Sequence, residues 1–367
     1  MRTTGEVWRL GRRPALDGLR GVAVILVVLS HADVPHFGGA GQVGVTVFFA
    51  LSGFLIATLL FEEHENSHRI SLRRFYRRRF FRLAPALLAV AAVTSLFALA
   101  TRAPWVTPRE VLGAVFYCSN VLAFFGPVGG AHMLHHTWSL VIEEQFYLVW
   151  PAVTILAWRR RTALLAVLLV TAGGSLALRC VLWNDGAGDN RVLFGTDTRV
   201  DGILLGCALA VSLRGGLWMR SRGRGRVAVV MGLACITFLA VWSSDAVMTV
   251  GLTLAALASA MVIVGVLANG DVRALTLRPV AWLGRRSYGL YLWHHPIAIV
   301  LGAFAVEWQI KTLILIPSSL LLTVLSWRCI EKPFLDRRER NSADPSPTTR
   351  GTATTPVDVS PGTPAAV

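Results

Sequence analysis

The sequence predicts an all-α integral membrane protein, a bundle of about ten transmembrane helices followed by a disordered C-terminal tail. The chain has 367 residues, of which 54% are hydrophobic and only 16% are charged. Its mean hydropathy is +0.56, and soluble chains of this length are seldom so apolar. Long apolar runs alternate with short Arg-rich segments, which is the pattern of a multi-span membrane protein.

The apolar runs that are long enough, or nearly long enough, to span a bilayer follow one another along the whole chain. They cover residues 16–33, 43–61, 83–101, 138–157, 162–183, 200–213, 226–243, 246–268, 288–306 and 310–328. Residues 111–125 form a further, shorter run, which predicts a re-entrant or interfacial piece. Counting it as a span would place the later Arg clusters outside, so the positive-inside rule favours about ten spans with a cytoplasmic N-terminus.

The predicted organisation has three parts: a cytoplasmic N-terminal segment (1–15), a transmembrane domain (16–335) and a disordered cytoplasmic tail (336–367). The tail is rich in Pro, Ser and Thr and cannot build a core. The first residues contain no short apolar region with a cleavage site, so we expect the first span to act as the insertion signal.

The net charge of +15 comes mainly from Arg clusters between the spans. This placement suits anionic lipid headgroups and does not indicate nucleic acid. The five cysteines are odd in number and lack metal-binding spacing. The histidines just before the fourth span, at 132, 135 and 136, are expected to be solvated. We therefore predict no metal site.

The first span carries two ionisable groups in the run LDGLRGVAVILVVLSHAD. Arg20 and His31 share one helix face, because eleven residues make three turns plus roughly 20°, with a rise of roughly 16 Å. Ionisable groups inside a span are costly and usually mark function. The alternative is that Arg20 snorkels to one interface and His31 lies in the opposite headgroup layer.

A dense cationic run, RISLRRFYRRRFFRLAP, leads into the third span. Arg79 and Arg82 are spaced i, i+3 and therefore lie on the same helix face. Guanidinium groups pair with phosphate in a bidentate manner, so this face predicts a site for a nucleotide-like ligand from the cytosol. Anchoring to lipids of the inner leaflet is the alternative.

The fourth span contains two adjacent carboxylates, Glu143 and Glu144, near its outer start. A buried carboxylate needs a partner, and His31 or a guanidinium is the expected kind, while Glu144 could instead face water. Other polar and aromatic side chains are candidates for lining a shared cavity: Trp138, Ser139, Tyr147, Asp197, Arg199, Asp201, Ser287, Tyr288, Tyr291 and His294. For the charged members of this set, a structural salt-bridge cluster is the alternative.

These stretches, taken in order, resemble the acyltransferase 3 family, the bacterial integral membrane O-acyltransferases that modify sugars, polysaccharides and some antibiotics. The resemblance covers residues 13–335. It is carried by DGLRGVAVILVVLSH, with an Arg, ten residues and a His, and by VGVTVFFALSGFLI, FYRRRFFRLAP, TWSLVIEEQFYLVWP, DTRVDGILLG, SYGLYLWHHP and EKPFL. Their joint presence and spacing make the resemblance specific.

The resemblance implies an acyltransferase that transfers groups other than aminoacyl groups. It would move an acyl group, commonly acetyl, from acyl-CoA to a hydroxyl of a glycan, a glycolipid or a glycosylated small molecule. By position, His31 matches the family's essential His and Arg20 the Arg before it. Arg79 and Arg82 match the Arg-x-x-Arg pair linked to donor recognition, and Glu143 matches the carboxylate of the WSL motif.

The chain departs from the family at one position, because many members have an acid where Thr46 stands here. A mechanism that needs a carboxylate at that position is in doubt for this chain. Some members also carry an appended extracellular esterase-like domain that receives the acyl group. This sequence does not contain one, so we expect the membrane domain alone to complete the transfer.

The predicted mechanism places acyl-CoA at the inner mouth of the bundle, with its phosphates on the arginines. His31 takes the proton of the acceptor hydroxyl, or alternatively forms an acyl-imidazole intermediate. Glu143 orients the imidazole as the acid of a triad does, and Tyr288 or Ser139 stabilises the oxyanion. No bound cofactor is expected.

A different class of function is a multi-span transporter or flippase, since intramembrane Arg, His and Glu also mark ion and substrate pathways. It would show substrate counterflow without dependence on acyl-CoA. In either case we expect a multi-pass protein of the bacterial cytoplasmic membrane, with both termini cytoplasmic and the lipid bilayer as a partner.

Overall fold

The computed structural model describes residues 9–124, 132–215, 222–242, 244–269 and 273–336. Over these residues the secondary structure is helical, and no strand occurs in them. The predicted tail lies outside the described residues apart from Asp336, as do residues 1–8 of the N-terminal segment.

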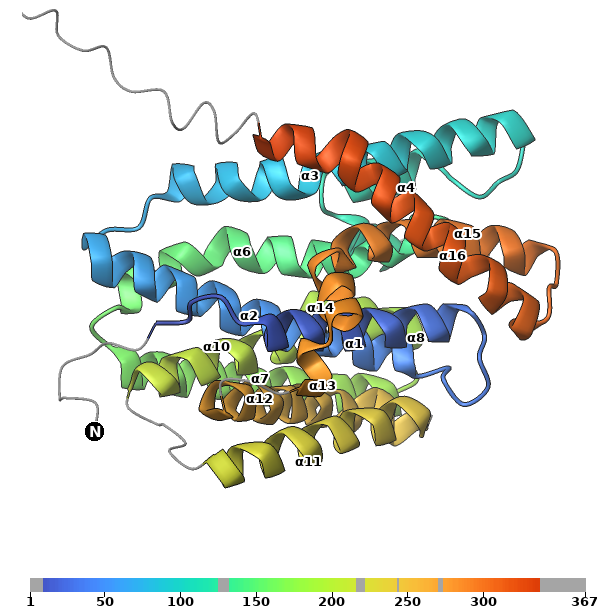
Figure 1. Ribbon diagram of the computed structural model, residues 1–367. Coiled ribbons are helices and arrows are strands. Elements are labelled where there is room, and N and C mark those ends of the chain that lie inside the picture. The colour runs from blue at the N-terminus through green and yellow to red at the C-terminus, as the bar shows by residue number, and fades with distance from the viewer. Residues whose placement is uncertain (1–8, 125–131, 216–221, 243, 270–272, 337–367) are drawn as a thin grey trace, which may run out of the picture.

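Within the described ranges, eight helices are long and apolar enough to cross a membrane. They are α1 (Pro14–His31), α2 (Ala40–Ser67), α3 (Leu72–Thr101), α6 (Trp138–Ala157), α7 (Arg161–Asn184), α11 (Arg222–Val241), α12 (Leu252–Asn269) and α16 (Trp308–Ser326). The helices run roughly parallel and antiparallel to one another in one bundle (Figure 1). The predicted class, an all-α membrane protein, is confirmed.

The predicted number of spans, about ten, is not confirmed. The expected spans at 200–213 and 288–306 form α10 (Asp201–Arg214) and α15 (Ser287–Ala303), of 14 and 17 residues. A helix needs about 20 residues to cross the hydrocarbon core. Both helices nevertheless pack inside the bundle, α10 against α2 and α15 against α16.

The short apolar run at 111–125 does not form one long helix in the described residues. It forms α4 (Pro108–Val115) and α5 (Ser119–Phe124), and Tyr117 between them has a positive φ of 53°. Thr107 begins α4 with a capping box that includes Glu110, which fixes the start of the helix. The remaining short elements are η1 (His135–Thr137), α8 (Asp189–Phe194), α9 (Thr196–Arg199), η2 (Val247–Gly251), α13 (Arg273–Thr276), α14 (Arg278–Arg285) and η3 (Trp327–Glu331).

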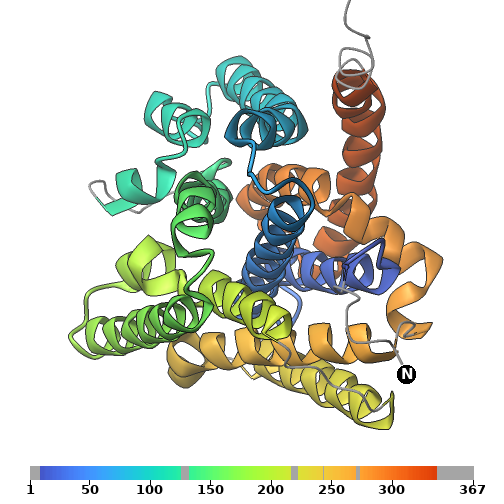
Figure 2. The ribbon, with the colours of Figure 1, turned by 90° about the vertical axis from the view of Figure 1, so that its left-hand side faces the viewer.

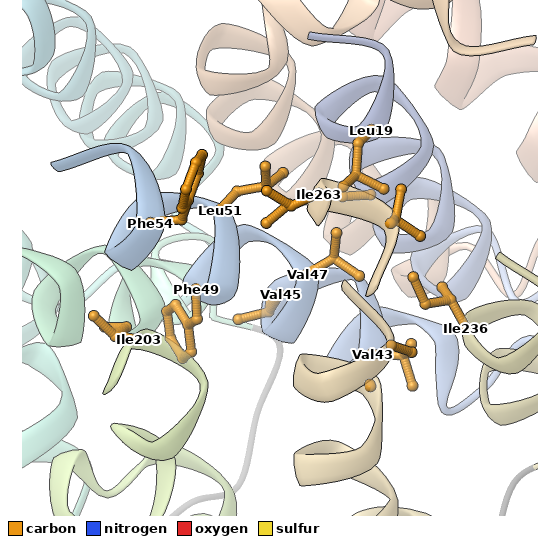
Figure 3. Close-up of a cluster of buried hydrophobic side chains, with 14 of the residues drawn as sticks. Leu19, Val43, Val45, Val47, Phe49, Leu51, Phe54, Ile203, Ile236 and Ile263 are labelled. Atoms are coloured by element: carbon orange, nitrogen blue, oxygen red, sulfur yellow. The ribbon is translucent and has the colours of Figure 1, made fainter. Parts of the chain in front are cut away.

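Helix α2 is the most deeply buried of the eight, and it packs against α1, α6, α10, α11 and α12. Its apolar side chains point in several directions into the surrounding helices (Figure 3). A Cβ on Gly53 would lie 2.0 Å from the carbonyl oxygen of Ile203, and one on Gly206 would lie 2.1 Å from that of Ala50. Glycine therefore lets the backbones of α2 and α10 approach closely.

The ends of α2, α6 and α10 and the starts of α3, α7 and α11 lie at one end of the bundle, on the left of Figure 1. Among the described residues, the arginines at 69–82 and 159–161, together with Arg214, Arg224 and Arg226, belong to these ends and their connections. The chain thus gathers much of its positive charge at one end, as the positive-inside pattern predicts.

Candidate active site

A cavity of about 430 Å³ lies among α2, α3 and α6, with parts of its wall from α1 and α15. Figure 2 shows the bundle turned by 90°, with α2 between α3 and α6 on one side and the helices of the later chain on the other. Its lining contains five arginines and three glutamates: Arg20, Arg74, Arg78, Arg79, Arg82, Glu63, Glu143 and Glu144. The positive excess favours an anionic ligand.

Two of these arginines are already paired. Arg79 donates to Glu144 at 2.6 Å, and its guanidinium carbon lies 3.4 Å from the centre of the Tyr147 ring. Arg78 pairs with Glu63 at 3.4 Å. Glu144 therefore faces the cavity and holds Arg79 in place by charge, while the aromatic face of Tyr147 adds a cation–π contact.

The other three arginines of the cavity, Arg20, Arg74 and Arg82, form no ion pair within 4.0 Å among the described residues. The Nε atom of Arg20 is buried and has no hydrogen-bond partner there. Arg74 and Arg82 are exposed, whereas Arg20 is half-buried and lacks an acceptor for its Nε, and a phosphate offers acceptors to all three. The cavity thus suits a ligand with several phosphates.

A smaller cavity, of about 60 Å³, adjoins the first and shares Arg20, Ser52, Glu143 and Tyr288 with it. Within it, the Oε1 atom of Glu143 accepts a hydrogen bond from the Ser52 hydroxyl at 2.9 Å. The smaller cavity also reaches side chains that the larger one does not: Val45, Phe48, Phe49, Ser139, Ser287 and Tyr291. A narrow polar path therefore continues inward from the cationic cavity.

Three hydroxyl groups on this path are held by hydrogen bonds. The Oγ of Ser139 lies 2.6 Å from the hydroxyl of Tyr291, which donates to the carbonyl of His136 at 2.7 Å. Tyr288 donates to the carbonyl of Leu83 at 2.8 Å. Since these donors are already used, an oxyanion would have to compete for them.

His31 lines neither cavity. Its Nδ1 lies 2.9 Å from the carbonyl oxygen of Val27, and its ring centre is 5.0 Å from those of His294 and His295. No contact between His31 and Glu143 occurs in the described part of the chain, where Glu143 instead bonds to Ser52. The predicted orienting contact between imidazole and carboxylate is thus not formed directly.

Tyr291 lies between the smaller cavity and the histidines around His31. It lines the smaller cavity, and its ring centre is 5.5 Å from that of His294, which contacts His31. A ligand that enters along the path from the arginines would meet Tyr291 before it reaches His31. Of the ten candidate lining residues, Ser139, Tyr147, Ser287, Tyr288 and Tyr291 line one of the two cavities, and Trp138, Asp197, Arg199, Asp201 and His294 do not.

Two of the predicted carboxylates belong to ion pairs away from the cavities. Asp201 accepts two hydrogen bonds of 3.0 Å from Arg179, whose side chain is completely buried. Asp197 pairs with Arg191 near the surface. The sequence analysis missed Arg179, although an Arg inside the apolar run at 162–183 was a visible signal. Asp197 and Asp201 thus form salt bridges, which was the alternative to a role in lining the cavity.

Arg199 pairs with neither carboxylate. It is 1% exposed, its Nη2 donates to the hydroxyl of Thr46 at 3.2 Å, and its guanidinium lies 5.6 Å from the Trp138 ring. The second terminal nitrogen, Nη1, has no hydrogen-bond partner in the described residues. Thr46, where many family members have an acid, thus stands directly beside a buried cation.

The residues that the sequence analysis did not single out are Ser52, Arg74, Tyr117 and His295. The expectation that His136 is solvated is wrong, because this residue is 3% exposed and its ring stacks on His295. Ser52 lies beside Gly53 in the apolar run at 43–61, where small side chains are typical of close helix packing. His136 and His295 each follow another His in the sequence, and this doubling was the available signal.

Fold and site together define a multi-span membrane protein with a polar, largely cationic site inside its helix bundle. The chain belongs to the acyltransferase family: the family model described as an acyltransferase domain matches residues 13–328. The resemblance drawn from the motifs is thereby confirmed.

Curated relatives are similar over most of the chain. A putative peptidoglycan O-acetyltransferase, YrhL, of Bacillus subtilis is 33% identical over 88% of this chain and 54% of its own length. The O-acetyltransferase OatA of Staphylococcus aureus is 33% identical over 88% of this chain and 57% of its own. The peptidoglycan O-acetyltransferase OatA of Listeria monocytogenes is 31% identical, with corresponding shares of 88% and 55%. The chain thus spans a little over half the length of these relatives, and no solved structure matches it.

Proposed function

We propose that this protein transfers an acyl group, most simply acetyl, from acyl-CoA to a hydroxyl of a glycan. The observation that carries the proposal is the cationic cavity, in which Arg20, Arg74 and Arg82 have no ion-pair partner among the described residues. Membership of the acyltransferase family supports the reaction type. The names of the relatives, which specify O-acetyl transfer and peptidoglycan, support the acyl group and the acceptor class.

In this proposal, the CoA phosphates bind to the unpaired arginines at the mouth of the larger cavity. Arg79, fixed by Glu144 and Tyr147, shapes that site. The pantetheine arm then follows the smaller cavity past Ser139 and Tyr291 and brings the thioester toward His31. Glu143 lines both cavities, so we assign it to balancing the charge of the arginines and not to orienting the imidazole.

His31 is suited to act as the base. A carbonyl oxygen only accepts hydrogen bonds, so the contact with Val27 places the ring hydrogen on Nδ1 and leaves the lone pair on Nε2. Nε2 takes the proton of the acceptor hydroxyl while that oxygen attacks the thioester carbonyl. The carbon–sulfur bond breaks, and the imidazolium returns the proton to the CoA sulfur. Attack by Nε2 itself, giving an acyl-imidazole, is the second route.

For orientation, we propose that the cationic cavity and both termini face the cytoplasm of a bacterial cell, where acyl-CoA is made. We expect the acceptor to be a peptidoglycan-type glycan. A lipid-linked sugar and a glycosylated metabolite are the alternative acceptors. No resident cofactor is needed for this chemistry.

The test is CoA release from acetyl-CoA by the purified protein in lipid vesicles, with and without peptidoglycan fragments. Wild type should release CoA in the presence of the fragments and acetylate them, and His31→Ala should abolish both while the protein still inserts. Substantial activity of His31→Ala would refute the assignment of the base. Absence of CoA release with acetyl-, propionyl- and longer acyl-CoA, together with counterflow of a sugar across vesicles, would instead favour the transporter class.

A further inference from the structure

Four histidine rings gather where α1 ends, beside residues of the smaller cavity. The ring centre of His31 is 5.0 Å from those of His294 and His295. The His136 ring stacks on His295 at 4.6 Å and lies 5.9 Å from His294. We refer to His31, His136, His294 and His295 as the imidazole cluster.

Backbone carbonyls fix the tautomers of three of the four rings. As in His31, the Nδ1 atoms of His294 and His295 each lie 3.1 Å from a carbonyl oxygen, those of Leu290 and Met133. Each Nδ1 therefore carries the hydrogen, and each neutral ring keeps its lone pair on Nε2. Three Nε2 atoms in the cluster are thus hydrogen-bond acceptors.

The cluster contains buried ring nitrogens without hydrogen-bond partners. His136 is 3% exposed and His294 is 0% exposed. Neither ring nitrogen of His136, and not the Nε2 of His294, has a hydrogen-bond partner among the described residues. Buried polar atoms are nearly always paired. A neutral His136 has one N–H donor and one acceptor nitrogen. The missing partners are therefore an acceptor for His136 and O–H or N–H donors for His136 and His294, which water or a ligand supplies.

The chemistry of the cluster selects among ligands. An anion such as phosphate has few or no hydrogens to offer to Nε2 lone pairs. In the described ranges, no group of three or more His, Cys, Asp or Glu is arranged to hold a metal ion. A neutral sugar ring carries several hydroxyl donors close together, and it matches a set of neighbouring neutral acceptors.

We propose that the imidazole cluster is the acceptor subsite and that it binds two or more hydroxyl groups of one sugar ring. This inference rests on the proposed acyl transfer. His136, His294 and His295 accept hydrogen bonds from hydroxyls that do not react, and they hold the reacting hydroxyl against Nε2 of His31. They are acceptor-binding residues and move no proton. The reaction itself is unchanged: the ester C–O bond forms, the thioester C–S bond breaks, and the hydroxyl proton passes through His31 to the CoA sulfur.

The test compares two acceptors that share a reacting group. A methyl glycoside of N-acetylglucosamine has ring hydroxyls, whereas tetrahydropyran-2-methanol has the same ring oxygen and hydroxymethyl group without them. Transfer from acetyl-CoA to each is measured with the full chain in vesicles. We expect kcat/KM to be at least about tenfold higher for the glycoside, because one neutral hydrogen bond is worth about that factor.

His294→Phe and His136→Phe keep ring size and remove the acceptor nitrogens. Each should reduce the preference for the glycoside by raising the KM for that sugar, while the KM for acetyl-CoA stays unchanged. His64→Phe is the matched control, because this imidazole of α2 packs on Trp158 and lines neither cavity. It should retain the wild-type preference.

Equal kcat/KM for the two acceptors in wild type would overturn the inference without any variant. An unchanged ratio in both Phe variants would also overturn it and would leave water as the donor to the cluster. If wild type releases no CoA with any acceptor, the proposed acyl transfer itself fails, and the two failures are thus distinguishable.

Discussion

Arg77 and Arg82 are both exposed arginines of α3, but only Arg82 lines the larger, cationic cavity. Arg82→Ala should raise the KM for acyl-CoA by roughly tenfold to a hundredfold, since a hydrogen bond to a charged group is lost. The kcat should change little, because the arginine binds ground and transition states alike. Steady-state CoA release measures both constants. Arg77→Ala is the control, and a similar rise in that variant would mean that surface charge alone attracts the donor.

The two Asp–Arg pairs differ in burial, and this difference predicts different stability effects. Asp201→Asn leaves the buried Arg179 without its counter-charge and should lower the free energy of unfolding by about 3–5 kcal/mol. Asp197→Asn breaks a partly exposed pair and should cost about 0–1 kcal/mol. Denaturation in detergent compares them, and equal losses would contradict the structural role assigned to the buried pair.

The sequence pointed to single residues, whereas their partners are seen only in the structure. The sequence predicted functional roles for Glu143 and His31 because ionisable side chains stand out in apolar runs. It paired them because an acid beside an imidazole is a familiar arrangement. In the structure Glu143 bonds to Ser52 and His31 to Val27. Which helix faces meet is decided by tertiary packing, which the local pattern does not contain.

At the scale of elements, the contact of α2 with α10 depends on having no side chain at position 53. In Gly53→Ala the added Cβ would overlap the carbonyl of Ile203, so the helices must separate. Gly173→Ala on α7 meets nothing within 4 Å, and it should be neutral or stabilise the helix by up to about 1 kcal/mol. In thermal unfolding, Gly53→Ala should therefore have a lower unfolding temperature than Gly173→Ala. A Gly53→Ala protein as stable as wild type would show that α10 can shift without cost.

Hydropathy located the long helices well, since an apolar run of about 20 residues is a local property. Eight predicted spans correspond to helices of sufficient length. The shorter α10 and α15 could not be distinguished from full spans by composition, because helices buried among other helices are as apolar as helices that face lipid. The run at 111–125 was predicted to be too short for a span, and in the described residues it forms the two short helices α4 and α5.

For the molecule as a whole, the excess of arginines in the larger cavity predicts that CoA alone stabilises the folded protein. Ligands that bind only the folded state raise the unfolding temperature, and the rise should shrink with added salt because phosphate contacts are screened. Thermal unfolding with CoA and with dephospho-CoA tests this. Equal shifts at low and high salt would argue against an ionic binding mode. The shift should be smaller for Arg82→Ala than for wild type.

The buried pair of Arg179 and Asp201 also bears on how the chain enters the membrane. The ribosome completes α7 before α10, and the two charged residues are 22 positions apart. Until Asp201 emerges, Arg179 near the end of α7 has no counter-charge, and a charge in an inserting helix is costly, by up to about 2.5–3.5 kcal/mol at the helix centre. The pairing therefore favours the release of these two segments into lipid together, after Asp201 has emerged.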